Sequence, residues 1–125
     1  MRILVVDDER DVQVLFEQRF RREIRNREVD FVFAYSGEDA LIFLNTLHDQ
    51  SMLILSDINM PGMSGLELLK QIKSRYTEPP HPVVMITAYG DEENYSTAMR
   101  LGANDFLTKP VDFSVLKEKL KDYIG

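Results

Sequence analysis

Four apolar runs in the sequence end in polar or charged residues that could do phosphate chemistry. These residues are Asp7 with Asp8, Asp57, Thr87 and Lys109. An aspartate can attack phosphorus or bind a metal ion, a lysine can pair with a phosphoryl oxygen, and a threonine hydroxyl can donate a hydrogen bond. Any one of these aspartates alone could be a turn residue, because turns favour aspartate. The chemistry therefore depends on a fold that brings all of these side chains together.

Apolar strand patterns alternate with helical patterns along the whole chain. Strands are predicted at residues 3–6, 29–34, 52–56, 83–88 and 105–108, and helices at residues 11–24, 36–47, 64–76, 91–101 and 112–124. Strict alternation predicts a parallel sheet with right-handed crossovers and helices on both faces. Residues 29–34 partly alternate apolar with polar side chains, which predicts an edge strand. The predicted fold class is therefore α/β, a flavodoxin-like (βα)5 domain with a five-stranded parallel sheet in the order 2-1-3-4-5.

Other side chains are expected to have structural roles only. The predicted helix N-caps are Asp11, Ser36, Ser64 and Asp112. The last helix carries a row of lysines that is expected to face solvent, namely Lys117, Lys119 and Lys121. The two histidines, His48 and His81, are expected at the surface or in loops, without a partner.

The composition limits the class of protein. With 125 residues, the chain is expected to form one domain spanning residues 1–125. The absence of cysteine excludes disulfides and thiolate metal sites. No apolar run approaches the roughly 20 residues that span a bilayer. The N-terminus does not resemble a signal peptide, so a cytoplasmic protein with no membrane contact is expected. The net charge of −6 argues against direct nucleic-acid binding.

In a parallel sheet the carboxyl ends of the strands meet at one edge, which would place Asp7, Asp8 and Asp57 beside Thr87 and Lys109. Three close carboxylates repel one another, and a bound divalent cation would relieve that repulsion. All-oxygen ligands suit Mg²⁺, whereas zinc would need cysteine or histidine nearby. A carboxylate beside Mg²⁺ can attack phosphorus and form an acyl phosphate. Because the pattern offers no positioned general base, it favours a slow phosphate acceptor over a rapid-turnover enzyme.

The same residues carry a resemblance to a known family. Asp7-Asp8, Asp57, residues 59–65 (Asn-Met-Pro-Gly-Met-Ser-Gly), Thr87-Ala88 and Lys109-Pro110 resemble the signature of response-regulator receiver domains. These domains are the phosphoacceptor modules of two-component signalling. The resemblance extends over essentially the whole chain, in order and with the spacing of the family.

The resemblance implies a role for each site residue. Asp57 would accept a phosphoryl group from a sensor histidine kinase or a phosphotransfer protein. Asp8 and Asp57 would bind Mg²⁺ directly, with the Asn59 backbone carbonyl as a further ligand, and Asp7 would act mainly through water. Thr87 and Lys109 would contact the phosphoryl group. The Lys109-Pro110 peptide bond would be cis.

The resemblance also implies a switch. Phe106 matches the aromatic switch position, where it keeps a ring but lacks the hydroxyl that a tyrosine would use to lock one state. Its rotation would be coupled to Thr87, and phosphorylation would reshape the surface of the fourth helix, the fifth strand and the fifth helix. A partner, or a second copy in a homodimer, would bind that surface. Asn59 and Tyr89 match positions that tune the phosphoryl lifetime, and Tyr89 would shield the acyl phosphate from water.

Three other functions fit parts of the pattern. A phosphatase or phosphotransferase of the haloacid-dehalogenase type would carry a second aspartate two residues after the nucleophile, where this chain has Asn59. A flavodoxin would need a Ser/Thr/Gly-rich phosphate loop after the first strand, where Asp7-Asp8-Glu9 would repel the flavin phosphate. A receiver-like interaction module that works without phosphorylation is the third alternative, and experiment must distinguish it.

Overall fold

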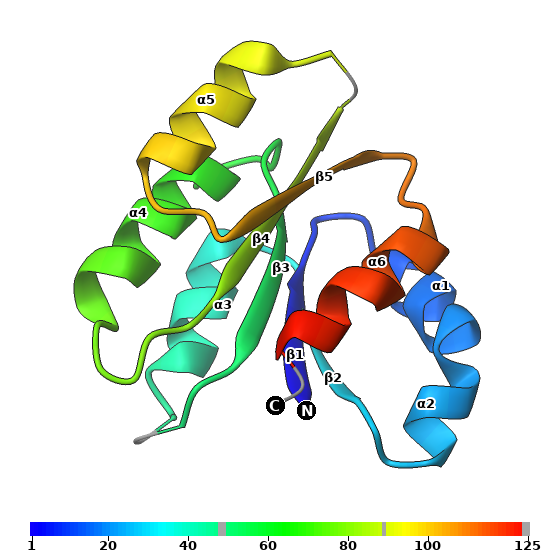
Figure 1. Ribbon diagram of the computed structural model, residues 1–125. Helices are drawn as coiled ribbons and strands as arrows, with labels where there is room; N and C mark the ends of the chain where they lie inside the picture. The colour runs from blue at the N-terminus through cyan, green and yellow to red at the C-terminus, as the bar shows by residue number, and fades with distance from the viewer. Residues whose placement is uncertain (48–49, 89, 124–125) are drawn as a thin grey trace.

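A computed structural model describes residues 1–47, 50–88 and 90–123 (Figure 1). Five parallel strands form its central sheet in the order β2-β1-β3-β4-β5, as predicted. The strands are β1 (Arg2–Val6), β2 (Asp30–Ala34), β3 (Leu53–Asp57), β4 (Val83–Ala88) and β5 (Asp105–Lys109). β2 lies at one edge of the sheet, and three of its five residues are only half-buried. The predicted edge strand is therefore confirmed.

Helices cover both faces of the sheet. They are α1 (Asp11–Arg19), α2 (Arg21–Arg25), α3 (Gly37–Leu44), α4 (Gly65–Arg75), α5 (Glu92–Arg100) and α6 (Phe113–Leu120), followed by a 3₁₀ turn, η1 (Lys121–Tyr123). Figure 1 shows α3, α4 and α5 on one face and α1, α2 and α6 on the other. None of the helices within the described ranges is long and apolar enough to cross a membrane.

Alternate residues of the strands feed the two halves of the core. Leu4 and Val6 of β1 pack into the half covered by α3, α4 and α5. Ile3 and Val5 pack into the half covered by α1 and α6. Because side chains alternate across a strand, a continuous apolar run indicates a strand buried on both faces. This packing holds the strand ends, and therefore the residues that follow them, in fixed positions.

The first predicted helix is in fact two helices. The chain leaves the helical conformation at Phe20, between α1 and α2, with φ −108° and ψ 21°. The Phe20 ring is buried beside Phe16, whereas Leu15 and Ile24, which stand at helical spacing with them, are exposed. The prediction of one helix over residues 11–24 was wrong because a one-residue break hardly changes the phase of an i, i+4 pattern.

Three of the four predicted N-caps are confirmed. Ser36, Ser64 and Asp112 each accept a hydrogen bond from a backbone N–H two or three residues later. Asp11 is not an N-cap, because it is the first residue of α1 and Arg10 occupies the cap position without a side-chain hydrogen bond. An acidic residue in the first turn still interacts favourably with the helix dipole, which explains its place there.

His81 lies in a loop, which is one of the two expected locations, but the expectation that it has no partner was wrong. Its ring is buried, and Nδ1 accepts a hydrogen bond from the backbone N–H of Met52 at 3.0 Å. Residues 80–82 contact the start of β3 through three hydrogen bonds, and a proline-rich sequence gives no signal for those contacts. His48 lies outside the described residues, as does Ile124, which was expected in the last helix.

The predicted row of solvated lysines on the last helix was also partly wrong. Lys117 reaches Glu23 of α2, with Nζ to Oε2 at 2.9 Å, and Lys119 reaches Asp105 of β5 at 3.1 Å. Both lysines are half-buried, whereas Lys121 is exposed. The two cross-element pairs tie α6 to its neighbours, which spacing along one helix could not indicate.

Candidate functional site

Three carboxylates meet at the carboxyl edge of the sheet. β1 and β3 are adjacent and in register at their ends, with Val6 opposite Ser56. The next residues along each strand therefore come together, and one carboxylate oxygen from each of Asp7, Asp8 and Asp57 lies within 4.8 Å of the others. The Asp57 side chain is 4% exposed and that of Asp7 is 12% exposed, whereas Asp8 is exposed.

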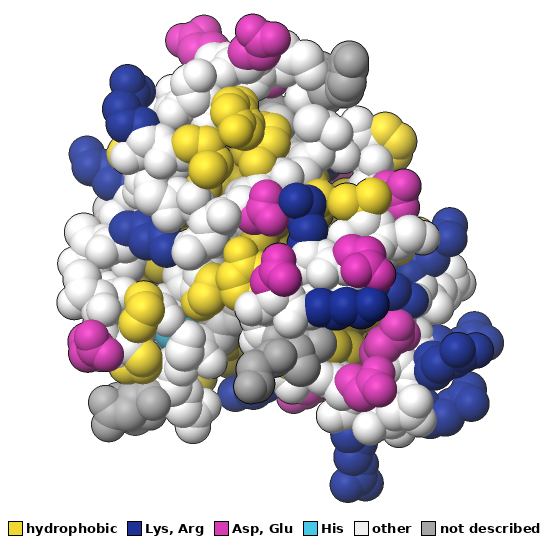
Figure 2. Space-filling view, viewed as in Figure 1, with side chains coloured by type: hydrophobic (Ala, Val, Ile, Leu, Met, Phe, Trp, Pro, Cys, Tyr) yellow, Lys and Arg dark blue, Asp and Glu magenta, His cyan; other side chains and the backbone are white. Residues whose placement is uncertain are grey.

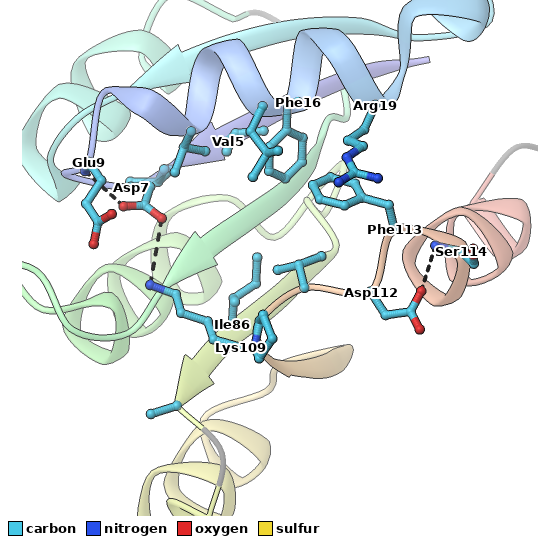
Figure 3. A pocket seen from close by; sticks show the side chains of 16 residues that line it. Val5, Asp7, Glu9, Phe16, Arg19, Ile86, Lys109, Asp112, Phe113 and Ser114 are labelled. Carbon is cyan, nitrogen blue, oxygen red and sulfur yellow. Dashed lines mark hydrogen bonds and ion pairs between the residues drawn. The ribbon is translucent and has the colours of Figure 1, made fainter.

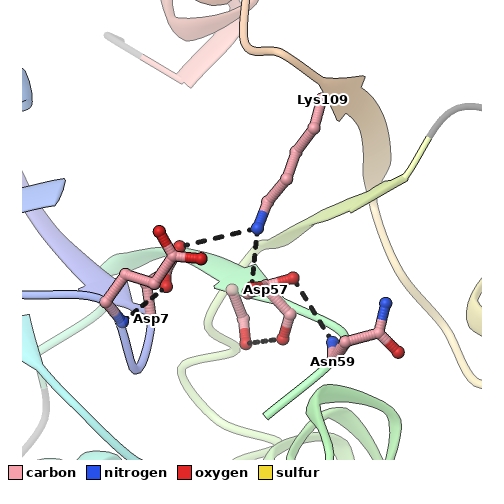
Figure 4. A network of polar contacts seen from close by, with 6 residues as sticks. Asp7, Asp57, Asn59 and Lys109 are labelled. Carbon is pink, nitrogen blue, oxygen red and sulfur yellow. Dashed lines mark hydrogen bonds and ion pairs between the residues drawn. The ribbon is translucent and has the colours of Figure 1, made fainter.

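Lys109 reaches this cluster from the end of β5, across the end of β4. Its Nζ lies 2.8 Å from Asp57 Oδ2 and 4.0 Å from Asp7 Oδ2. Figure 4 shows the lysine side chain extended toward both carboxylates. The other Asp57 oxygen, Oδ1, accepts a hydrogen bond from the Asn59 backbone N–H at 3.3 Å. Both oxygens of Asp57 therefore face positively polarised groups.

The crowding of charges has opposite effects on two side chains. Burial raises the pKa of Asp7, and the charge of Asp57 adds to this, although the Glu9 N–H bond at 2.9 Å opposes it. Burial alone would lower the pKa of Lys109, but its hydrogen bond to Asp57 and the surrounding acids outweigh burial and raise that pKa. Lys109 is therefore held protonated, while the Asp7 carboxylate carries an electrostatic cost.

Thr87 contributes a hydroxyl group that lacks a partner. The residue is 1% exposed on β4, and Oγ1 makes no hydrogen bond within the described part of the chain. β4 runs between β3 and β5, and Asp57 pairs in register with Ile86, the residue before Thr87. Buried polar atoms are almost always satisfied, so an orphaned hydroxyl beside a candidate nucleophile suggests a missing acceptor such as a phosphoryl oxygen.

The loop after Asp57 depends on Gly65, which belongs to the signature at residues 59–65 but was given no role of its own. A Cβ atom built on Gly65 would overlap the Asp57 carbonyl oxygen and would lie 2.7 Å from the Ile58 Cα. The Gly65 N–H also donates to the Ile58 carbonyl at 2.8 Å. α4 can therefore begin directly beneath the site only because position 65 has no side chain. The Ser64-Gly65 pair at a helix start was the available signal.

Phe106, the expected aromatic switch residue, packs against a neighbouring helix. Phe106 is half-buried on β5, and its ring packs edge-on against Tyr95 of α5 with 4.8 Å between ring centres. The expected coupling of Phe106 to Thr87 stays a prediction. Tyr89, which was expected to shield the acyl phosphate, lies outside the described residues. The Lys109-Pro110 peptide bond is cis, as expected.

The donor set at this edge fits a magnesium ion. The ligand atoms that the cluster offers are carboxylate oxygens, with no nitrogen or sulfur among them. Hard oxygen ligands and room for water are what Mg²⁺ prefers. The exposed position of Asp8 leaves one side of the cluster open to solvent.

Comparison with known proteins identifies the class. A family model described as the response regulator receiver domain matches residues 3–121. This protein therefore belongs to the response-regulator receiver family, which is a signalling family and not one of classical turnover enzymes.

Individual relatives include chemotaxis regulators. The chain is 34% identical to the chemotaxis protein CheY homolog of Campylobacter jejuni, over all of this chain and 93% of the relative. A response regulator receiver protein from Pseudomonas putida superposes with a TM-score of 0.81 at 28% identity, over 97% of this chain and 95% of the other. The receiver domain of Ssk1 from Saccharomyces cerevisiae, crystallised with the histidine phosphotransfer protein Ypd1, gives a TM-score of 0.80 at 27% identity, over 98% and 88%.

Proposed function

We propose that this protein is a phosphoacceptor switch that takes a phosphoryl group on Asp57. The observation that carries the proposal is the convergence on Asp57 of Lys109, Asp7 and Asp8, beside the unpartnered Thr87 hydroxyl. A nucleophile, a fixed cation, a hydroxyl donor and a cluster of oxygen ligands surround one position. A phosphoryl group could sit there with each of its free oxygens facing a positively polarised group.

In the proposed reaction, a carboxylate oxygen of Asp57 attacks phosphorus in the donor. A new O–P bond forms, the bond from phosphorus to the donor breaks, and its electron pair leaves with the donor group. Lys109 Nζ, now paired with Asp57, would turn to a phosphoryl oxygen, and the Thr87 hydroxyl would donate to another. Asp57 would pass from a carboxylate to an acyl phosphate.

Asp7, Asp8 and Asp57, with the Asn59 backbone carbonyl, are the residues proposed to hold Mg²⁺. When bound, the ion supplies positive charge that offsets the negative charge of the phosphoryl oxygens. The cluster of three carboxylates with a single lysine lacks that charge, which supports an obligatory metal ion.

The donor is proposed to be a histidine kinase or a phosphotransfer protein. An apolar groove of about 790 Å³ runs from the site between α1 and the segment that joins β5 to α6 (Figure 3). Its apolar walls include Val12, Leu15, Phe16, Val111 and Phe113. A protein helix in this groove would lie against Asp7 and Lys109, and Lys109 contacts Asp57 at 2.8 Å. The related Ssk1 receiver domain was crystallised with a histidine phosphotransfer protein, which supports this kind of partner.

The output surface is proposed to be the face of α5, β5 and α6, which are the fourth helix, fifth strand and last helix of the predicted order. Tyr95 is 47% exposed and Met99 is 39% exposed on α5, and Figure 2 shows apolar side chains gathered over this helix. Thr87 and Phe106 lie on the adjacent strands β4 and β5. Phosphorylation would shift the population between two packings of this face, and a partner or a second copy would bind one of them.

Residues 1–125 are proposed to act as one receiver domain, in the cytoplasm and without direct contact with nucleic acid. The rival enzyme and flavodoxin functions lack support, because Asn59 stands where an acid would be needed and an acidic cluster fills the phosphate loop. A receiver-like module that works without phosphorylation is the remaining alternative.

Treatment with acetyl phosphate, with and without Mg²⁺, followed by intact-mass measurement tests the proposal. We expect a gain of one phosphoryl group that requires Mg²⁺ and is absent in Asp57→Asn. The matched control is Asp105→Asn, which removes a different strand aspartate, half-buried on β5, and should still be labelled. No gain in the folded wild-type protein would overturn the proposal and favour the phosphorylation-independent module.

A further inference from the structure

One strongly charged region takes no part in the proposed chemistry. Residues 19–27 hold five arginines and a single acid, Glu23, so this segment carries a charge of +4. Since the whole chain carries −6, the other 116 residues carry −10. Figure 2 shows these cationic side chains gathered over α1 and α2 at the lower right of the molecule. Such a local reversal of sign is a feature of surfaces that select a charged partner.

The cations surround a concave surface, here called the arginine hollow. It has a volume of about 500 Å³ and lies where the end of α1, α2 and α6 meet. Its cationic lining is Arg19, Arg21, Arg22, Arg25 and Lys117. A concave site accepts protruding acidic side chains better than it accepts a flat surface.

Lys117 is held by neighbouring groups, whereas most arginines of the hollow form no ion pair within the described residues. Lys117 is held in place because its Nζ donates to the Arg19 carbonyl at 2.8 Å and pairs with Glu23 at 2.9 Å. The only acid of the segment is thus already neutralised. Within residues 1–47, 50–88 and 90–123, Arg22 and Arg25 form no ion pair with a carboxylate. Both are exposed, and their planar guanidinium groups can bind carboxylates through two hydrogen bonds each.

The hollow adjoins the apolar groove that Asp7 and Lys109 also line. Arg19 lines both, and its guanidinium lies 5.6 Å from the centre of the Phe113 ring in the groove. Figure 3 places Arg19 at the opposite end of the groove from Asp7 and Lys109. The nine residues of α1 span about 13 Å at 1.5 Å per residue. An apolar stripe that ends in a cluster of cations matches a polypeptide with an apolar ridge and an acidic end.

We propose that the arginine hollow binds an acidic segment of the protein that delivers the phosphoryl group, and so selects among possible donors. This inference rests on the proposed function of Asp57. A duplex nucleic acid or an anionic membrane fits less well, because a long or flat polyanion would also meet the acidic remainder of the surface. A short acidic segment avoids that repulsion.

The test uses a fluorescein-labelled amphipathic peptide with leucines at helical spacing and a run of glutamates at one end. Binding to the full chain is measured by fluorescence anisotropy at low and high salt. We expect Arg22→Glu with Arg25→Glu to weaken binding at least about tenfold, and salt to weaken binding to the wild type. The matched control is Arg75→Glu with Arg100→Glu, which reverses two arginines that also lie in last helical turns, on the other face of the sheet. It should bind like the wild type.

Equal weakening in both variants, or none in either, would overturn the proposal. Arg22→Gln with Arg25→Gln gives the milder test if the charge-reversed variant does not fold. The same measurements with duplex DNA and with anionic phospholipid vesicles should show weaker binding than the peptide. Tighter binding of either polyanion through Arg22 and Arg25 would overturn the choice of an acidic protein segment.

The link to the donor is tested by the rate at which acetyl phosphate labels Asp57. Saturating peptide should slow labelling of the wild type, because a helix in the groove covers the approach to Asp57, and should not slow labelling of the Arg22→Glu, Arg25→Glu variant at the same concentration. No slowing would overturn the assignment to the phosphodonor. Without peptide, the Arg22→Glu, Arg25→Glu variant and the Arg75→Glu, Arg100→Glu control should both be labelled at the wild-type rate. If the wild type is not labelled at all, the function of Asp57 fails, while the anisotropy result still decides whether the hollow binds acidic peptide.

Discussion

The two edges of the sheet are built on opposite principles. At the amino edge, polar groups satisfy one another: His81 accepts from Met52 at 3.0 Å, and Asn104 Oδ1 accepts from the Val83 N–H at 2.9 Å and from Lys73 Nζ at 2.8 Å. At the carboxyl edge, Asp7 and Asp57 share Lys109 beside the third carboxylate of Asp8, and the Thr87 hydroxyl has no partner within the described residues.

This difference separates stability from reactivity. Hydrogen bonds at the amino edge join the starts of β3 and β4 to the loops beside them. The clustered carboxylates and the Thr87 hydroxyl at the carboxyl edge are groups that a metal ion and a phosphoryl group could satisfy. A site built to bind a ligand in this way lowers the stability of the ligand-free fold. The hydrogen bonds at the amino edge offset that loss.

The largest expected effect comes from adding a side chain at Gly65, beneath the carboxyl edge of the sheet. Gly65→Ala should lower the free energy of unfolding by about 3 kcal/mol, because its Cβ would overlap the Asp57 carbonyl oxygen, and backbone atoms cannot rotate away. Urea denaturation measures this loss. Gly37→Ala is the control, since Gly37 also follows a serine N-cap but the three atoms nearest to its Cβ would belong to the Met63 side chain. Its cost should stay below about 1 kcal/mol, and equal costs would contradict the prediction.

A second prediction concerns Lys109, the cation at the carboxyl edge. Lys109→Gln should slow labelling of Asp57 by acetyl phosphate about 100-fold, because the variant loses the charge 2.8 Å from Asp57 that would stabilise the phosphoryl oxygens. The rate of mass gain in the presence of Mg²⁺ measures this. Lys119→Gln, which removes another half-buried lysine that pairs with a strand aspartate, should leave the rate unchanged. An unchanged rate in Lys109→Gln would show that this lysine only balances charge.

A third prediction concerns the repulsion among the three carboxylates at the carboxyl edge, which Asp7→Asn should relieve. Burial raises the pKa of Asp7, so the folded state binds this proton more tightly than the unfolded state, and stability falls as pH rises through the folded pKa. At neutral pH the cost is fully present, and Asp7→Asn should raise the free energy of unfolding by about 1 kcal/mol without metal. Mg²⁺ should stabilise the wild type more than the variant. Asp11→Asn, at an exposed position, should show neither effect. A destabilised Asp7→Asn would contradict the comparison.

The smallest predicted effect is a pH dependence of stability that comes from the amino edge. Burial lowers the pKa of His81, with the charge of Lys73 contributing, and Nδ1 must be unprotonated to accept from Met52. The unfolded state therefore takes up a proton first, and stability should decline as pH falls below about 6.5, the ordinary histidine pKa. His81→Asn keeps an acceptor without the titration, so its stability should decline less between about pH 7 and pH 5. Parallel declines in urea midpoints would refute the prediction.

Much of the architecture could be predicted from local sequence alone. Continuous apolar runs and helical spacing determined the five strands and their order, because a parallel sheet with right-handed crossovers leaves few arrangements. The same rule placed Asp7, Asp57, Thr87 and Lys109 at one edge, since polar residues that follow parallel strands must meet there. Ser36 and Ser64 were readable as caps because capping is a contact over three residues.

Tertiary structure alone decided the features that depend on contacts between distant segments. The break at Phe20, the burial of His81 against β3 and the pairing of Lys117 with Glu23 all follow from packing that no local pattern records. The short approach of Lys109 to Asp57 and the unpartnered Thr87 hydroxyl also exist only in the folded chain. Sequence periodicity determines which element a side chain belongs to and which way it faces, whereas its partners depend on how the other elements fill the space around it.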